Sequence, residues 1–207
     1  MESLTVYLFV FDGLADWEAG HAIAGLNNPA FQVRPGRYRV RTAAVETRPI
    51  VTAGGVTILP DGPLEAVEPA GTAMLILPGG DAWDRGGNAE ALQKAGTLLH
   101  AGIPVAAICG ATAGLARASL LDDKRHTSNS ADYLAATGYR GGGLYQNELA
   151  VTDGGLITAS GTAPVDFAYH IFARLDVYAA DAALAWRSLF KTGDPAYYAA
   201  LLRAIGA

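Results

Sequence analysis

The stretch VAAICGATAGLA, residues 105–116, begins as an apolar run typical of a buried strand and continues as small residues that suit a helix start. Cys109, the only cysteine in the sequence, stands at the junction. A strand that turns sharply into a helix projects its corner side chain out of the sheet, and small neighbours let the chain fold back on itself. The stretch therefore predicts an α/β unit with a cysteine at its turn.

Two interpretations of Cys109 follow from its position. A helix N-terminus stabilises a thiolate through the helix dipole and its free N–H groups, which favours a reactive nucleophile. A lone cysteine is also among the most buried residue types and then acts as an inert small hydrophobe. The stretch alone does not separate the two, so partners elsewhere in the chain must decide.

The remaining sequence alternates between strand and helix patterns. Continuous or alternating apolar runs predict strands at residues 4–11, 38–45, 73–80 and 103–109, and glycine pairs predict hairpins at residues 50–59 and 148–160. Helical spacing predicts helices at residues 15–28, 88–102, 128–138 and 163–175, and two more from residue 179 onward, separated by Gly193, Asp194 and Pro195. Asn88 and Thr162 are expected as N-caps.

Strands that alternate with helices indicate an α/β fold, a three-layer sandwich whose mostly parallel sheet carries helices on both faces. The sequence contains no long linker, low-complexity tract or internal repeat. We therefore expect a single domain over residues 1–207, with extra C-terminal helices from about residue 179.

The composition limits the possible partners. Apolar residues make up 51% of the 207 residues, and the net charge is −5 without a basic cluster, so a nucleic-acid partner is not expected. No apolar run approaches the ~20 residues of a membrane span, and no basic leader precedes the first strand, so we expect a cytoplasmic protein with no membrane partner. The histidines lack metal-ligand spacing, so neither a metal nor a cofactor is expected.

Candidate partners of Cys109 follow the predicted strands, whose carboxyl ends gather ligands in open α/β sheets. The backbone N–H groups of Gly79, Gly80 and Gly110 are candidates for an oxyanion hole, although glycines also simply end strands. Glu18 follows the first strand and, if protonated, donates a hydrogen bond to a thiolate and moves a proton. Asp16 is a candidate substrate-binding residue in the same segment, where helix capping is the alternative role.

His126 lies downstream of Cys109 in the polar stretch KRHTSNS. An imidazole in this position is a candidate for orienting or deprotonating the thiol. The alternative is a surface histidine that caps a turn, and the sequence alone favours that alternative.

Four segments together resemble the ThiJ/PfpI superfamily, which is related to the class I glutamine amidotransferases. They are GLADWE, LILPGGDAW, VAAICGATAGLA and ITASGTAPVDF, and the resemblance runs from Leu4 to about Leu175. It implies a flavodoxin-like fold, a strained backbone at Cys109, a hydrogen bond from Glu18 to Cys109, and oxyanion positions at Gly80 and Gly110. It also implies a homodimer that acts on a small molecule. His126 falls near the histidine of the superfamily, at a different spacing.

The departures from the superfamily narrow the expected reaction. Its protease-like members carry a histidine directly after the cysteine, where this sequence has Gly110, and the H-x-E motif of the amidotransferases is absent. Isocyanide hydratases place aspartate where Glu18 stands. We therefore expect a hydrolase, glyoxalase or deglycase-like reaction on a small carbonyl or amide, in which a Glu18→Gln change raises the thiol pKa.

Two non-catalytic alternatives stay open at this point. In one, the protein senses oxidative stress through an oxidisable Cys109. In the other, it is a binding module whose cysteine is buried and inert.

Overall fold

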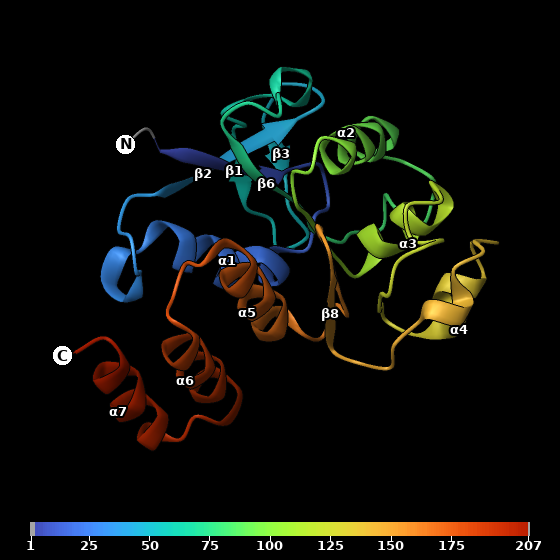
Figure 1. Ribbon diagram of the computed structural model, residues 1–207. Helices are drawn as coiled ribbons and strands as arrows, with labels where there is room; N and C mark the ends of the chain where they lie inside the picture. Colours follow the sequence, from blue (N-terminus) through green and yellow to red (C-terminus); the bar gives the residue numbers. More distant parts are fainter. Residues whose placement is uncertain (1–2, 207) are drawn as a thin grey trace.

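A computed structural model describes residues 3–206. Within this part of the chain, the main sheet has seven strands in the order β5-β2-β1-β6-β7-β9-β8, and all neighbours are parallel except β8 and β9 (Figure 1). The strands are β1 (Leu4–Phe9), β2 (Tyr38–Ala44), β5 (Gly62–Pro63), β6 (Thr72–Leu77), β7 (Val105–Ile108), β8 (Ala150–Asp153) and β9 (Leu156–Ala159). The prediction of a mostly parallel α/β sheet is confirmed.

The strand order is that of a flavodoxin-like fold. From β1 the chain moves first outward to β2 and then, through β6, β7 and β9, in the opposite direction across the sheet. The carboxyl ends of β1 and β6 flank this reversal, which is where doubly wound sheets open a crevice for ligands.

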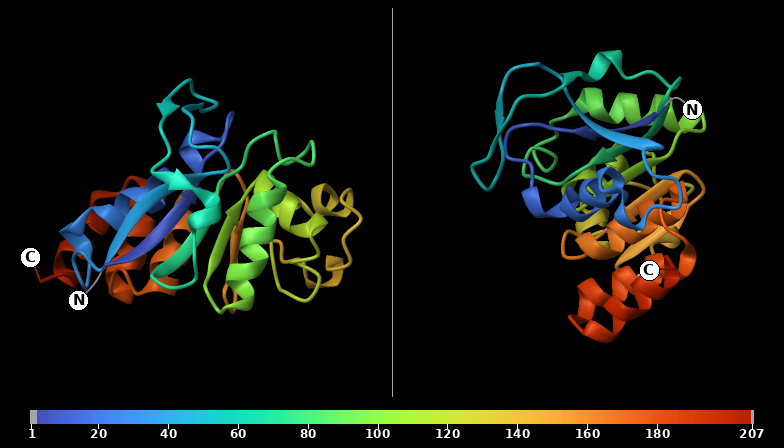
Figure 2. Two further views of the ribbon diagram at one scale, coloured as in Figure 1. Left: turned by 90° about the horizontal axis from the view of Figure 1, so that it is seen from above. Right: turned by 90° about the vertical axis from the view of Figure 1, so that its left-hand side faces the viewer.

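Helices cover both faces of the sheet and make a three-layer sandwich. α1 and α5 lie side by side on one face, and α2 lies on the other (Figure 1). α6 packs on α5 and α7 packs on α6, so the last two helices extend away from the sheet (Figure 2). The helices are α1 (Asp16–Asn27), α2 (Ala89–His100), α3 (Gly110–Arg117), α4 (Ala131–Ala135), α5 (Pro164–Leu175), α6 (Ala180–Thr192) and α7 (Pro195–Ala204).

The central strands are the most buried part of the molecule. Every residue of β6 and β7 is buried, because helices cover both faces of a parallel sheet. β1 ends at Phe9 rather than at Phe11 as predicted. The chain leaves the sheet there, and the ring of Phe11 packs between those of Phe9 and Trp83 beneath the turn at Gly13.

Both predicted hairpins form. β3 (Ile50–Val51) pairs antiparallel with β4 (Thr57–Ile58), and β8 pairs antiparallel with β9. β5 was not predicted from the sequence, since Gly62 and Pro63 are poor strand residues.

Of the two predicted helix caps, Asn88 is confirmed in position and Thr162 is wrong. Asn88 occupies the N-cap of α2 in a left-handed conformation, with φ of 61°, and its side chain makes no capping bond. The N-cap of α5 is Ala163, because the Thr162 hydroxyl instead pairs with the Ser160 hydroxyl at 3.0 Å. Pro164 does open α5 as predicted.

A buried carboxylate joins the C-terminal helices to the rest of the fold. Asp166 on α5 is only 3% exposed, and its two oxygens accept hydrogen bonds from Arg187 at 2.7 Å and Lys191 at 2.8 Å, both on α6. Among residues 3–206, no helix is both long and apolar enough to cross a bilayer.

Candidate active site

Cys109 occupies a strained turn between β7 and α3. Its φ is 57° and its ψ is −125°, a conformation that costs a non-glycine residue about 1–3 kcal/mol. Hydrogen bonds on both sides of the residue hold the backbone there. The Cys109 N–H donates to the Ala159 carbonyl at 3.0 Å, and the Thr112 hydroxyl donates to the Cys109 carbonyl at 2.6 Å. The cysteine is therefore fixed at the carboxyl end of the sheet in a conformation that its surroundings impose.

Glu18 lies directly beside this cysteine. It belongs to the first turn of α1 and is completely buried. Its Oε2 accepts a hydrogen bond from the Gly79 N–H at 2.5 Å. Its Oε1 faces the thiol and has no well-formed hydrogen bond to any residue that the structure describes. One carboxyl oxygen is thus anchored, and the other faces the thiol without a hydrogen-bond partner among the described residues.

Two glycines make this close approach possible. A Cβ on Gly79 would lie 2.7 Å from the Cβ of Cys109, and a Cβ on Gly161 would lie 2.8 Å from its Sγ. Gly161 was not predicted from the sequence, although the stretch that contains it was noted as a strand end followed by a helix. Gly79 was predicted to donate to an oxyanion. This role is wrong, because Glu18 already takes its N–H.

The other two candidate oxyanion donors, Gly80 and Gly110, line the same pocket as Cys109. The Gly80 N–H has no acceptor among the described residues, and the Gly110 N–H begins α3 and faces Cys109. A Cβ on Gly110 would lie 3.0 Å from the Gly80 carbonyl and 3.2 Å from the Trp83 ring. Position 110 therefore has little room for a side chain of any kind.

Burial governs the protonation of the Cys109–Glu18 pair. It raises the pKa of Glu18 from 4.5 to about 7. Burial also raises the pKa of the Cys109 thiol, and the negative charge of Glu18 raises it further, to about 11. The expectation that Glu18→Gln raises the thiol pKa is therefore reversed, because the substitution removes a charge that disfavours the thiolate.

Asn129 is a further contact of the thiol, and it was not predicted from the sequence. Its Nδ2 donates to the Cys109 Sγ at 3.4 Å, and its Oδ1 accepts from the Gly161 N–H at 2.9 Å. The second bond fixes which end of the amide faces sulfur, so this side chain lowers the thiol pKa. It stands only three residues after His126 in KRHTSNS, where the sequence drew attention to the imidazole.

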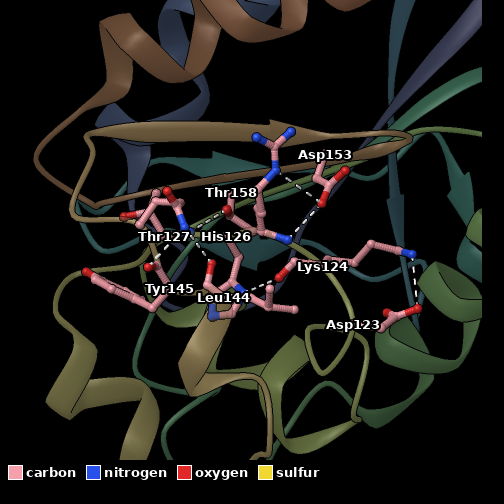
Figure 3. Close-up of polar contacts among 10 residues, drawn as sticks. Asp123, Lys124, His126, Thr127, Leu144, Tyr145, Asp153 and Thr158 are labelled. Atoms are coloured by element: carbon pink, nitrogen blue, oxygen red, sulfur yellow. Dashed lines mark hydrogen bonds and ion pairs between the residues drawn. The ribbon is translucent and has the colours of Figure 1, made fainter.

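Both ring nitrogens of His126 pair with groups other than the thiol, and its predicted role at Cys109 is wrong. The residue is fully buried, with Nδ1 2.7 Å from the Lys124 carbonyl and Nε2 2.9 Å from the Tyr139 hydroxyl. Neighbouring backbone bonds to Leu144 and Thr158 secure the same loop (Figure 3). With both ring nitrogens occupied, His126 holds the loop that carries Asn129 and has no nitrogen left for the thiol.

Asp16 also has a structural partner rather than a place beside the thiol. Its Oδ2 accepts a hydrogen bond from the Gly54 N–H at 2.7 Å, which ties the start of α1 to the β3–β4 hairpin. Hydrogen bonds to Thr52 and Gly54 lower the pKa of Asp16. The predicted role of Asp16 in substrate binding is therefore replaced by one in loop positioning.

A pocket of about 200 Å³ opens above the thiol. Cys109, Glu18, Gly80 and Gly110 contribute to its wall from the β7–α3 turn, the start of α1 and the loop after β6. Other parts of the wall come from Trp17 on α1, Asp81 and Asp84 after β6, and Asn129 and Tyr133 near α4.

The doubly wound sheet and the strained cysteine define a class of protein, namely flavodoxin-like α/β proteins with a cysteine at a sharp strand-to-helix turn. The sequence matches the DJ-1/PfpI family over residues 4–174, and the chain belongs to this family.

Relatives support this assignment over the full length. The chain is 39% identical to a Bacillus subtilis protein named as the uncharacterized protease YoaZ, over 99% of each chain. It is 37% identical to a thiJ/pfpI family protein from Bacillus anthracis, whose crystal structure superposes with a TM-score of 0.90 over 100% of this chain and 99% of the other. A DJ-1 superfamily protein from Agrobacterium tumefaciens shares 27% identity and a TM-score of 0.81, over 92% and 100%.

Proposed function

We propose that the protein is a cysteine-dependent enzyme that acts on a small carbonyl or amide electrophile. One observation carries the proposal. Cys109 is held in a strained turn beside the free Oε1 of the buried Glu18, and both residues line one pocket together with Gly80 and Gly110. A purely structural cysteine needs neither the strain nor a buried carboxyl beside it.

The geometry suggests the following first step. The Cys109 Sγ attacks the carbonyl carbon, and its proton passes to Oε1 of Glu18 as the C–S bond forms. The π electrons of the carbonyl move onto its oxygen, where the Gly80 and Gly110 N–H groups stabilise the negative charge. Glu18 then returns the proton to the leaving group, or to the oxyanion when nothing leaves. Because the pKa of Glu18 is about 7, the same carboxyl serves as base and as acid near neutral pH.

Peptide hydrolysis fits the site less well, although relatives carry protease names. Position 110, where the protease-like members would have histidine, is closely packed against Gly80 and Trp83. The pocket of about 200 Å³ is also small for a peptide segment. Small-molecule chemistry is the better match.

An oxidation sensor receives less support than an enzyme. Rapid reaction with peroxide needs a thiolate, and burial together with Glu18 raises the thiol pKa to about 11. If mild peroxide converts Cys109 stoichiometrically to the sulfinate while no carbonyl or amide is turned over, the sensor is the correct function.

The test of the enzyme is turnover of methylglyoxal and a panel of small amides, with wild type compared to Cys109→Ala. We expect activity that depends on Cys109 and, on rapid quenching, a covalent adduct at this residue by mass spectrometry. Turnover that survives in Cys109→Ala would overturn the proposal.

The assembly and location are part of the same proposal. The lone cysteine suits a reducing compartment, so we place the protein in the cytoplasm. The resemblance favours a homodimer, and sedimentation equilibrium would give twice the chain mass if this is correct.

A further inference from the structure

The wall of the active-site pocket carries charge of only one sign. Glu18, Asp81 and Asp84 contribute carboxyl groups to it, and no Lys, Arg or His residue belongs to the wall among the described residues. Arg117 lies nearby on α3, but its guanidinium donates to the Trp83 carbonyl at 2.7 Å. The described part of the wall therefore offers no cationic side chain to pair with an anionic group on a substrate.

The two aspartates differ in how they are held. Asp84 accepts a hydrogen bond from the Tyr133 hydroxyl at 2.5 Å, which links the loop after β6 to α4 across the pocket. Burial and Asp84 both raise the pKa of Tyr133, so its hydroxyl stays neutral and remains a donor. The Asp81 side chain is exposed and forms no hydrogen bond or ion pair with any residue in the described part, so its charge stays available.

An aromatic ring completes the wall. Trp17 is 58% exposed, unusually high for tryptophan, although the next residue along α1 is completely buried. An indole face is the best aromatic partner for a cation in proteins. Carboxylates and an exposed indole in one small pocket are complementary to positive charge.

We propose that this pocket selects a small electrophile that carries a positive charge, such as a carbonyl compound with an ammonium or amidinium group, and rejects anionic ones. Asp81 and Asp84 attract the cationic group, and Trp17 packs against it while the carbonyl reaches Cys109. This inference rests on the proposed function, because it assigns a substrate class to the same cysteine.

The test uses three methanethiosulfonates of similar size that differ in charge. The probes carry a trimethylammonioethyl, a hydroxyethyl or a sulfonatoethyl group. In each reaction the Cys109 sulfur bonds to the thio sulfur of the reagent, methanesulfinate leaves, and the thiol proton passes to Glu18 or solvent. Each rate constant is divided by that of the same reagent with free 2-mercaptoethanol. We expect the cationic reagent to react about 10-fold faster than the anionic one at low salt, with the neutral reagent between them.

Variants distinguish the effect of the pocket carboxylates on the rates from the effect of the overall charge of the protein. The double change Asp81→Asn and Asp84→Asn should reduce the cation-to-anion ratio to about threefold or less. Glu68→Gln is the control for loss of a surface charge, because Glu68 is exposed and precedes β6, at the end of the strand away from Cys109, and the ratio should stay within twofold of wild type. Trp17→Leu should slow the cationic reagent relative to the neutral one.

The outcomes distinguish this inference from the proposed function. If Cys109 reacts with all three reagents at equal normalised rates, or if Glu68→Gln changes the ratio as much as the double variant does, charge selection by the pocket is wrong and the enzyme proposal stands. If Cys109 reacts with none of them while the protein is folded, the proposed nucleophile is itself wrong.

Discussion

At the scale of single residues, the site combines three features that cost stability. Cys109 has a strained backbone, and Glu18 is a carboxyl buried beside it. Position 161 must be glycine, because a Cβ there would collide with the Cys109 sulfur. Such features are typical of functional sites, where stability is reduced to hold reactive groups in place.

The buried carboxyl makes stability depend on pH. Because the pKa of Glu18 rises from 4.5 to about 7 in the fold, the native state binds more protons than the unfolded state between these values. The contribution of Glu18 to stability therefore falls as pH rises from about 4.5 to 7, by about 3 kcal/mol in all. We predict that Glu18→Gln is up to about 3 kcal/mol more stable than wild type at pH 8 and close to it at pH 4.5, as measured by urea unfolding. Equal stability differences at both pH values would contradict the burial of Glu18.

The same substitution, Glu18→Gln, should make the thiol easier to ionise and yet slow turnover. Removal of the Glu18 charge lowers the thiol pKa, since that charge opposes the thiolate. The pH dependence of iodoacetamide labelling measures this shift. Turnover should nevertheless fall about 100-fold or more, because no carboxylate remains to move the proton. A rise in the thiol pKa would show that Glu18 mainly stabilises the thiolate.

The close packing of Gly161 can be tested with a matched glycine. A Cβ at Gly161 would lie 2.8 Å from the Cys109 sulfur, whereas one at Gly142 would meet nothing within 4 Å. We predict that Gly161→Ala costs about 1–3 kcal/mol of stability and slows labelling of Cys109, while Gly142→Ala does neither. Thermal unfolding and labelling rates give both readouts, and unchanged labelling in Gly161→Ala would contradict the proposed contact.

At the scale of elements, the sequence predicted the strands correctly but not the contacts made by side chains in the loops. The apolar runs predict the central strands and both hairpins because burial in a parallel sheet needs continuous apolar sequence. In the loop after α3, the sequence predicted the wrong residue as the contact of the Cys109 thiol. His126 points to Lys124 and Tyr139, and Asn129 reaches the thiol, because partners far along the chain set the direction of each side chain.

The β3–β4 hairpin depends on a side chain from another element. Asp16 at the start of α1 accepts from the Gly54 N–H, so the hairpin is held next to the pocket. We predict that Asp16→Ala increases hydrogen exchange of the hairpin amides by about 10-fold, since one charge-assisted bond is lost. Amides of the β8–β9 hairpin serve as the internal control and should not change. Unchanged exchange at Gly54 and Val56 would show that Asp16 does not hold the hairpin.

At the scale of the whole molecule, one buried ion-pair cluster connects the C-terminal helices to the sheet layers. Arg187 and Lys191 on α6 together lower the pKa of Asp166 on α5, against the effect of burial. Its contribution to stability is therefore present above the ordinary aspartate pKa and is lost as pH falls below that value.

Loss of this carboxylate should loosen the attachment of α6 and α7. Asp166→Asn leaves two cations without their partner, so we predict a loss of about 3 kcal/mol at pH 7 that becomes smaller near pH 3. The measurement is chemical unfolding at both pH values, with the exposed Asp181→Asn on α6 as control. A loss that is the same at both pH values would point to packing rather than charge.

The sequence by itself determined the fold class, the turn at Cys109 and the position of Glu18 in the helix that follows the first strand. These depend on local patterns, namely apolar runs, small residues at a sharp turn and spacing along the chain. Only the tertiary structure decided that the Gly79 N–H donates to Glu18, that Asn129 rather than His126 contacts the sulfur, and that the pocket wall is acidic. Those features depend on which groups burial and hydrogen bonding bring together from distant segments, and no local pattern encodes such pairings.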